Sequence, residues 1–168
     1  MTIAPSAGSL AELLPGSWHI GATNFPMWLR GDRLSPTLTY EVRSEQPLKF
    51  LDTVTYTTPA GVAKTIVGVD TFRGDGSDAA GFVWRGRGLL FPFASHWTVE
   101  GVGRSDEFVV TRFSKSLVTP AGVDIMVRHG AQLDAQELRT IVATSPEEFG
   151  LEPEDLASLT WLELPTSA

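Results

Sequence analysis

The residues of this sequence that could carry acid–base chemistry lie on segments in which apolar and polar side chains alternate. In residues 48–57, one set of alternate positions holds Phe50, Asp52, Val54 and Tyr56. Successive side chains of a β-strand point to opposite sides, so this set is expected to share one face and to carry Asp52 into an apolar interior. Burial favours the neutral carboxyl group, and a carboxyl group that titrates near neutrality suits a general acid or base.

Further residues are candidates for the same chemistry. Tyr40 and Tyr56 could supply additional acid–base groups, and Asp70 and Arg112 are added if their side chains face inward. The alternation around Asp70 and Arg112 is irregular, so the sequence leaves both orientations open. A structural interpretation is preferred for the two acids: each would pair with Arg112, with Tyr40 or with a backbone donor, since structural pairs perturb carboxyl groups as readily as active sites do.

Other kinds of chemistry have little support. The three histidines, at positions 19, 96 and 129, lack metal-ligand spacing, and the chain has no cysteine, so no metal site is expected. The serines lack a Gly-x-Ser-x-Gly elbow, and the glycine pairs form no dinucleotide-binding fingerprint. We therefore expect no cofactor.

The charge balance and composition restrict the possible partners. The formal charge is −7, from 13 Lys and Arg against 20 Asp and Glu, which disfavours nucleic acid and anionic membrane surfaces. Residues 1–10 have neither the basic nor the apolar region of a signal peptide, and no apolar run is long enough to span a bilayer. Together with the lack of cysteine, this predicts a soluble, cytoplasmic protein; its oligomeric state stays open.

Short runs of β-branched and aromatic residues, separated by Gly, Pro, Asp and Ser, must position these side chains. Such runs are typical of all-β folds, and eight of them close a small antiparallel up-and-down barrel. The predicted strands are 18–24, 37–44, 48–57, 62–72, 80–86, 95–100, 107–115 and 122–128. Apolar residues at helical spacing in 133–142 predict a helix on the outside of the barrel. We expect one domain, 1–168, with the barrel in about 16–129 and a helical segment in about 133–164.

Three short motifs appear in order along this framework. Gly16-Ser17-Trp18 opens the first strand, Ser105-Asp106-Glu107-Phe108 lies between the sixth and seventh, and Arg128 ends the eighth, before the helix. In this order they resemble the motifs of the lipocalins, within the calycin superfamily, over roughly residues 10–151. The resemblance implies an eight-stranded barrel with Trp18 at its closed end and Arg128 stacked on the indole, both structural rather than ligand-binding.

The predicted interior is aromatic and sparsely polar. By strand alternation Leu38, Tyr40 and Val42 also face inward. The residues expected to bind ligand are Trp28, Tyr40, Phe50, Asp52, Tyr56, Phe82, Trp84 and Trp97. Such a lining suits an apolar molecule with one or two polar groups, although the rings could instead fill the barrel completely.

Residues 25–36 form a long, aromatic link between the first two predicted strands. A loop of this kind at a barrel mouth is often a lid, and we expect 25–33 to fold over the open end and gate the pocket through Met27 and Trp28. Arg30 and Arg33 would stay in water or meet a carboxylate of the ligand. The alternative is a fixed plug.

Two functions follow from this sequence. The first is a carrier or sensor that binds a small, mainly apolar molecule inside the barrel, because an aromatic interior occurs without a recognisable catalytic constellation. The alternative is a cofactor-free isomerase, cyclase, dehydratase or hydrolase that acts on an apolar substrate, with Asp52 and the tyrosines as acid and base. The polarity of the pocket floor distinguishes the two.

Overall fold

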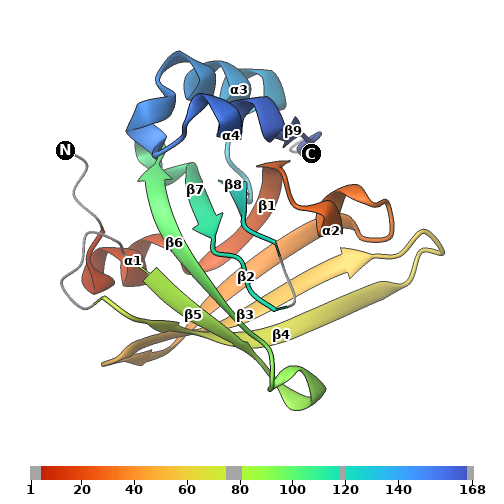
Figure 1. Cartoon of the computed structure of the whole chain (residues 1–168), viewed down its shortest axis with the longest axis vertical. Helices are drawn as coiled ribbons and strands as arrows, with labels where there is room; N and C mark the ends of the chain where they lie inside the picture. The colour runs from red at the N-terminus through yellow and green to blue at the C-terminus, as the bar shows by residue number, and fades with distance from the viewer. Residues whose placement is uncertain (1–4, 75–80, 118–119, 166–168) are drawn as a thin grey trace.

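The computed structural model describes residues 5–74, 81–117 and 120–165, and eight antiparallel strands in it close into a barrel (Figure 1). Consecutive strands pair with one another, and the pairing of β8 with β1 completes the ring. The strands are β1 (Gly16–Thr23), β2 (Leu34–Glu45), β3 (Leu48–Thr57), β4 (Ala63–Phe72), β5 (Gly81–Gly86), β6 (Ala94–Val102), β7 (Phe108–Phe113) and β8 (Gly122–Arg128). The predicted all-β barrel is confirmed, and every expected strand is present within a few residues; position 80 lies outside the described residues.

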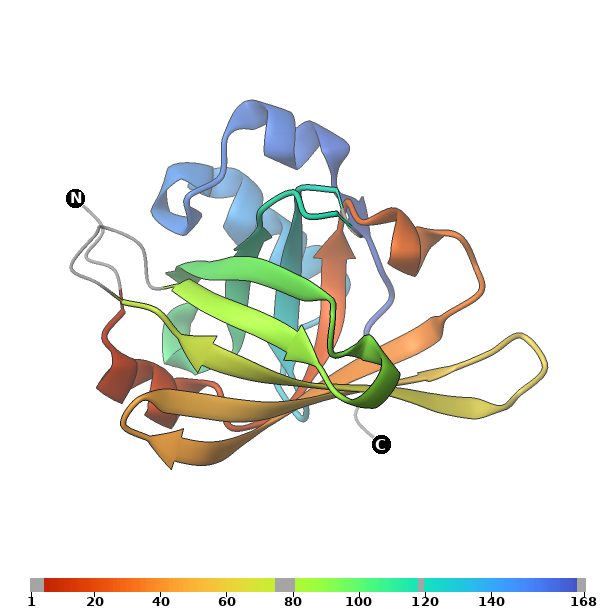
Figure 2. The same cartoon turned by 60° about the horizontal axis from the view of Figure 1, so that its bottom comes forward.

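Helices cover one wall of the barrel and one of its ends. Helix α3 (Ala135–Thr144), η3 (Pro146–Phe149) and α4 (Pro153–Ser158) lie against the wall formed by β6, β7, β8 and β1, as Figures 1 and 2 show. Asp134 and Glu137 form a capping box at the start of α3. The predicted helix in 133–142 is therefore confirmed. None of the described helices is long and apolar enough to cross a membrane.

Strand β1 changes partner part-way along its length. Its first half pairs with β2, whereas Ala22 and Thr23 pair with the short strand β9 (Thr160–Trp161). A bulge between Ile20 and Ala22 marks the change, and it turns Gly21 toward α3. A Cβ atom at Gly21 would lie 2.7 Å from the Leu138 side chain, so a larger residue there would force the side chains at this contact to shift. The bulge thus fixes the C-terminal segment on the barrel wall.

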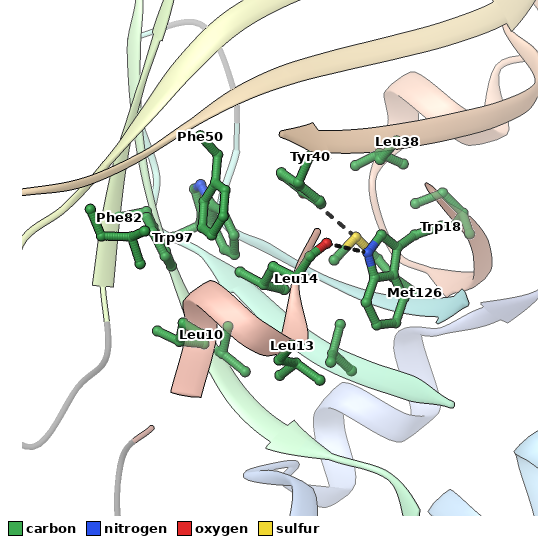
Figure 3. Packing of buried hydrophobic residues seen from close by; sticks show 14 residues of the cluster. Leu10, Leu13, Leu14, Trp18, Leu38, Tyr40, Phe50, Phe82, Trp97 and Met126 are labelled. Atoms are coloured by element: carbon green, nitrogen blue, oxygen red, sulfur yellow. Dashed lines mark hydrogen bonds between the residues drawn. The ribbon is translucent and has the colours of Figure 1, made fainter. Parts of the chain in front are cut away.

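Helix α1 (Ala7–Leu13) closes the end of the barrel opposite the short helix α2 (Pro26–Leu29), as Figure 1 shows. Trp18 is fully buried beneath α1, and its Nε1 donates a hydrogen bond to the Leu14 carbonyl oxygen at 2.9 Å (Figure 3). The Arg128 guanidinium lies 4.2 Å from the centre of the indole ring and donates to the carbonyl oxygens of Leu13, Pro15 and Asp106. The stacking predicted from the family resemblance is confirmed.

The barrel has two apolar clusters, one inside it and one outside. The inner cluster includes Leu10, Leu14 and Trp18, and the outer one lies between the wall and the C-terminal helices. Val42 lies opposite Phe50 and therefore on the inner face as expected, but it is 40% exposed. The pairing of β1 with β2 begins at Gly16 opposite Tyr40, so Val42 lies beyond the end of β1 and lacks a neighbour on that side.

Candidate ligand-binding site

A cavity of about 450 Å³ occupies the half of the barrel nearest α2. Its walls come from β2 to β8, and the loop that contains α2 covers its mouth. The aromatic side chains that line it are Phe25, Trp28, Tyr40, Tyr56, Trp84, Phe93, Trp97 and Phe113. The aromatic rings therefore do not fill the barrel. Of the two interiors that the sequence allowed, open for a ligand or filled by side chains, the structure has the open one.

Six of the eight expected ligand-binding residues line this cavity, namely Trp28, Tyr40, Asp52, Tyr56, Trp84 and Trp97. Phe50 and Phe82 face inward but do not line it. They belong to the packed inner cluster, where the ring of Phe82 stacks on Trp97 with centres 4.6 Å apart and Phe50 lies 5.7 Å from Phe82. These two rings support the floor of the cavity instead of forming its surface.

Asp52 and Asp70 come together on the inner face of the barrel. In the register of β3 and β4, Phe50 lies opposite Asp70 and Asp52 opposite Gly68, so the two acids are diagonal neighbours. Asp52 lines the cavity, whereas Asp70 is completely buried behind it and accepts a 2.8 Å hydrogen bond from Trp97 Nε1. The orientation that the sequence left open for Asp70 is thus inward.

Burial changes the titration of both carboxyl groups. The pKa of Asp52 is raised well above its ordinary value, first by desolvation and then by the negative charge of Asp70. Desolvation also raises the pKa of Asp70 to about 7, while hydrogen bonds from Trp97 and Asp52 oppose the shift. Two buried carboxyl groups this close favour a shared proton, so the pair retains at least one proton near neutrality.

Asp124 is a third buried acid at the cavity, and the sequence reasoning missed it. It lies on β8, pairs with Thr23 and Thr111 across the sheet, and is 3% exposed. Desolvation raises its pKa to about 7, while the Thr23 hydroxyl and the Trp28 indole favour its ionised form. Strand β8 is buried on both faces, so its apolar residues do not alternate and gave no sign of which way Asp124 points.

Tyr40 and Ser95 complete the polar part of the lining. The Tyr40 hydroxyl donates only to Met126 Sδ, at 3.8 Å, as Figure 3 shows. Burial raises the pKa of Tyr40 well above its usual value, and the charges of Asp52, Asp70 and Asp124 raise it further. Ser95 Oγ is buried without a hydrogen-bond partner in the described structure. The site therefore groups acidic and hydroxyl side chains beneath an aromatic wall.

Comparisons with solved structures identify this architecture. Lobster apocrustacyanin A1 superposes with a TM-score of 0.61 at 11% identity, over 98% of this chain and 89% of that one. The siderocalin Ex-FABP gives 0.55 at 12% identity, over 92% and 96%, and the bovine lipocalin allergen Bos d 2 gives 0.52 at 12% identity, over 90% and 93%. This chain has the lipocalin fold. No protein-family model matches it, and no curated protein matches it in sequence.

Within the lipocalin fold, the loop between β1 and β2 lies at the open end of the barrel. Here Met27 and Trp28 are half-buried and line the cavity, together with Phe25, Arg30 and Arg33. Phe25 anchors the loop because its amide donates to Thr23 Oγ1 and its ring packs edge-on against Phe113. The loop covers the mouth as expected, and its action as a gate stays a prediction.

Arg112 lies outside the cavity of the lipocalin barrel. On β7 the inward positions are Val109, Thr111 and Phe113, whereas Arg112 faces the C-terminal segment. Its guanidinium makes two hydrogen bonds to the Asp155 carboxylate, at 2.8 and 3.1 Å, and another to the Gly150 carbonyl oxygen. Arg112 instead forms an ion pair that holds α4 to the outer wall. This position fits neither an acid–base role in the cavity nor the expected pairing with Asp52 or Asp70.

The histidines lie on the surface of the barrel, away from the cavity lining. Two of them meet, which the sequence reasoning did not anticipate: His19 Nε2 and His129 Nδ1 are 2.9 Å apart, because Trp18 pairs with Arg128 and brings the ends of β1 and β8 together. Within residues 5–74, 81–117 and 120–165, no three His, Asp or Glu side chains are grouped as metal ligands.

Proposed function

We propose that this protein binds a small, mainly apolar molecule in the barrel cavity and acts as a carrier or sensor for it. The observation that carries the proposal is an aromatic cavity of about 450 Å³ with a few buried polar groups in its lining. Small-molecule sites in proteins have volumes of roughly 300–1,000 Å³ and combine apolar walls with a few polar groups that fix orientation. The siderocalin Ex-FABP, with the same fold, is described as functioning through dual ligand specificities.

A titration with a neutral apolar fluorophore tests this proposal. N-phenyl-1-naphthylamine should bind with micromolar affinity, with increased probe emission and quenching of tryptophan fluorescence. A variant that fills the cavity, Ser95→Phe, should lose most of the binding because Ser95 lines the pocket. The matched control is His96→Phe on the same strand, whose side chain is exposed on the outer face and should not affect binding. Absence of binding, or equal loss in both variants, would refute the proposal.

The pairing of Asp52 with Asp70 favours a second candidate, a cofactor-free enzyme that transfers protons. A carboxyl pair that shares a proton offers an acid and a base side by side, and Asp52 lies at the cavity opposite Tyr40 in the β2–β3 register. Such a pair could remove a proton α to a carbonyl group and protonate the oxygen, giving an enol.

Hydrogen exchange into a model ketone tests the second candidate. In D₂O, the protein should accelerate replacement of the α-protons of 2-tetralone by deuterium, observed by NMR, and Asp52→Asn should abolish the acceleration. Exchange no faster than in buffer of the same pH would exclude this proton-transfer chemistry and leave the binding function in place.

A cytoplasmic location is part of the proposal. The sequence contains no cysteine, which is compatible with a reducing compartment. Fractionation of cells that express the untagged chain tests it, and recovery outside the cytoplasm would contradict it.

A further inference from the structure

The buried acids of this protein have no buried base beside them. Among the described residues, three carboxyl groups are buried, those of Asp52, Asp70 and Asp124, and no lysine, arginine or histidine is. Buried acids are normally paired with a base, because an uncompensated charge in an apolar interior is costly. Asp52 and Asp124 line the same cavity as Tyr40, and Asp70 is the diagonal neighbour of Asp52 on the inner face. The protein itself supplies no buried cation for this region.

The same acids have unused hydrogen-bonding capacity. Asp52 Oδ1, Asp70 Oδ2 and Asp124 Oδ1 are buried without a partner donor in the described structure. The indole of Trp97 is already committed to Asp70, and the Tyr40 hydroxyl is directed at Met126. A buried polar atom without a partner is destabilising, so the site favours a ligand that brings donors.

Aromatic rings surround the acids at the cavity. Tyr40, Trp84 and Trp97 line it beside Asp52, and Trp28 lines it beside Asp124. The faces of such rings carry partial negative charge and attract organic cations, most strongly when both are shielded from water. Gly68 allows the Trp84 indole to approach β4, because a Cβ atom there would lie 2.2 Å from Trp84 Nε1. Acids and ring faces therefore favour the same kind of ligand.

We propose that the ligand is an apolar primary amine whose ammonium group enters the cavity and pairs with Asp52 and Asp124. This inference rests on the proposed function and specifies its ligand class. The ammonium group supplies three donors and one positive charge to the region where the buried acids have no base. The hydrocarbon part of the ligand packs against the aromatic side chains of the lining.

The arginines at the mouth fix the direction of entry. Arg30 and Arg33 line the outer part of the cavity, and Arg33 lies over the Tyr56 ring, 5.4 Å from its centre. They disfavour an ammonium group at the mouth relative to a position beside the buried acids. A second polar group on the ligand, if anionic, would therefore remain beside Arg30 and Arg33.

Binding of the ammonium group has a defined proton balance. In the free protein the buried carboxyl groups hold protons near neutrality. An ammonium group that enters as RNH₃⁺ stabilises the carboxylate, so a carboxyl proton passes to the buffer. A neutral ligand such as an alcohol or a ketone requires no such release. The sign of the proton exchange therefore reports the chemical class of the ligand.

Three probes of one shape test the proposal: 2-naphthylmethylamine, the neutral 2-naphthylmethanol and the anionic 2-naphthoate. At pH 6.5, below the pKa of about 7 of Asp70 and Asp124, we expect the amine to bind at least tenfold more tightly than the alcohol, and the acid to bind most weakly. Calorimetry in phosphate and in Bis-Tris should show proton release with the amine and none with the alcohol. This readout needs no variant, so it holds even if substitutions of the buried acids impair folding.

The variant Asp124→Asn localises the effect, with Asp106→Asn as control, because Asp106 is exposed outside the cavity. Asp124→Asn should reduce the preference for the amine over the alcohol at least fivefold and leave the affinity for the alcohol within twofold. Equal binding of amine and alcohol, or binding without proton release, would overturn the amine proposal while the proposed function stands. Failure of all three probes to bind would overturn both.

Discussion

The two halves of the barrel interior use the same strands in opposite ways. In the half under α1, the polar atoms of Trp18 and Arg128 all find backbone partners, and rings such as Phe50 pack without exposure. In the half under α2, the carboxyl groups of Asp52 and Asp124 keep oxygen atoms without donors, and aromatic side chains border a cavity of about 450 Å³. The hydrogen bonds and packing of the half under α1 are complete without a ligand, whereas those of the half under α2 are not.

The difference indicates which half of the barrel stabilises the fold and which half destabilises it. Close packing and satisfied hydrogen bonds stabilise the closed half. Buried acids and unfilled volume destabilise the open half, as expected of a site whose missing partners come from a ligand. Substitutions should therefore affect folding in the first half and affinity in the second.

The largest effect is expected for Trp18→Ala. This change removes a fully buried indole together with its hydrogen bond to Leu14 and the surface on which Arg128 stacks. The free energy of unfolding, measured with urea, should fall by about 5 kcal/mol. Trp84→Ala should lower the free energy of unfolding less, because the Trp84 side chain borders the cavity and is only half-buried. An equal or smaller loss for Trp18→Ala would contradict the comparison.

The next effect concerns pH and Asp124. Its folded pKa of about 7 exceeds its ordinary value, so the folded state binds the proton more tightly than the unfolded state. The contribution to stability is complete below about pH 4 and is lost as the pH rises through 7, on the order of 4 kcal/mol in all. Urea unfolding of the protein and of Asp124→Asn between pH 4 and 8 should show a decline with pH that the variant reduces. Equal slopes would show that Asp124 does not titrate from a buried position.

A smaller effect is expected for Trp28→Ala in the loop over the cavity. Trp28 is half-buried and lines the cavity, so its removal should weaken the binding of N-phenyl-1-naphthylamine severalfold. The free energy of unfolding should change by less than about 1 kcal/mol, because α2 has only four residues and no buried residue. A loss of several kcal/mol would make Trp28 a fixed plug of the core instead of a gate.

The smallest effect is expected for Arg30→Gln at the mouth. The Arg30 side chain is exposed, so the substitution should leave stability unchanged. Removing one positive charge beside the entrance should raise the affinity for 2-naphthylmethylamine about twofold at low salt, and the gain should vanish at about 1 M salt. A decrease in affinity for this amine would mean that Arg30 contacts the ligand in another way.

The sequence predicted the barrel well because strand alternation and turn residues are local signals. Asp52 and Tyr40 were placed inward because polar residues separate the apolar ones on β2 and β3. Asp124 was missed and Arg112 left unplaced because β7 and β8 are covered on both faces, so apolar residues occupy inward and outward positions alike. The partners of Asp70 and of Arg112 come from distant strands and helices, and only the tertiary structure brings them together.

A crystal structure with 6-bromo-2-naphthylmethylamine tests the central claim most directly, because anomalous scattering from bromine locates the ligand. The account predicts the naphthalene ring inside the open half of the barrel, in contact with Trp84 and Trp97, and the amine nitrogen within hydrogen-bond distance of Asp52 and Asp124. Bromine found only on the outer surface, with side chains filling the interior, would contradict it.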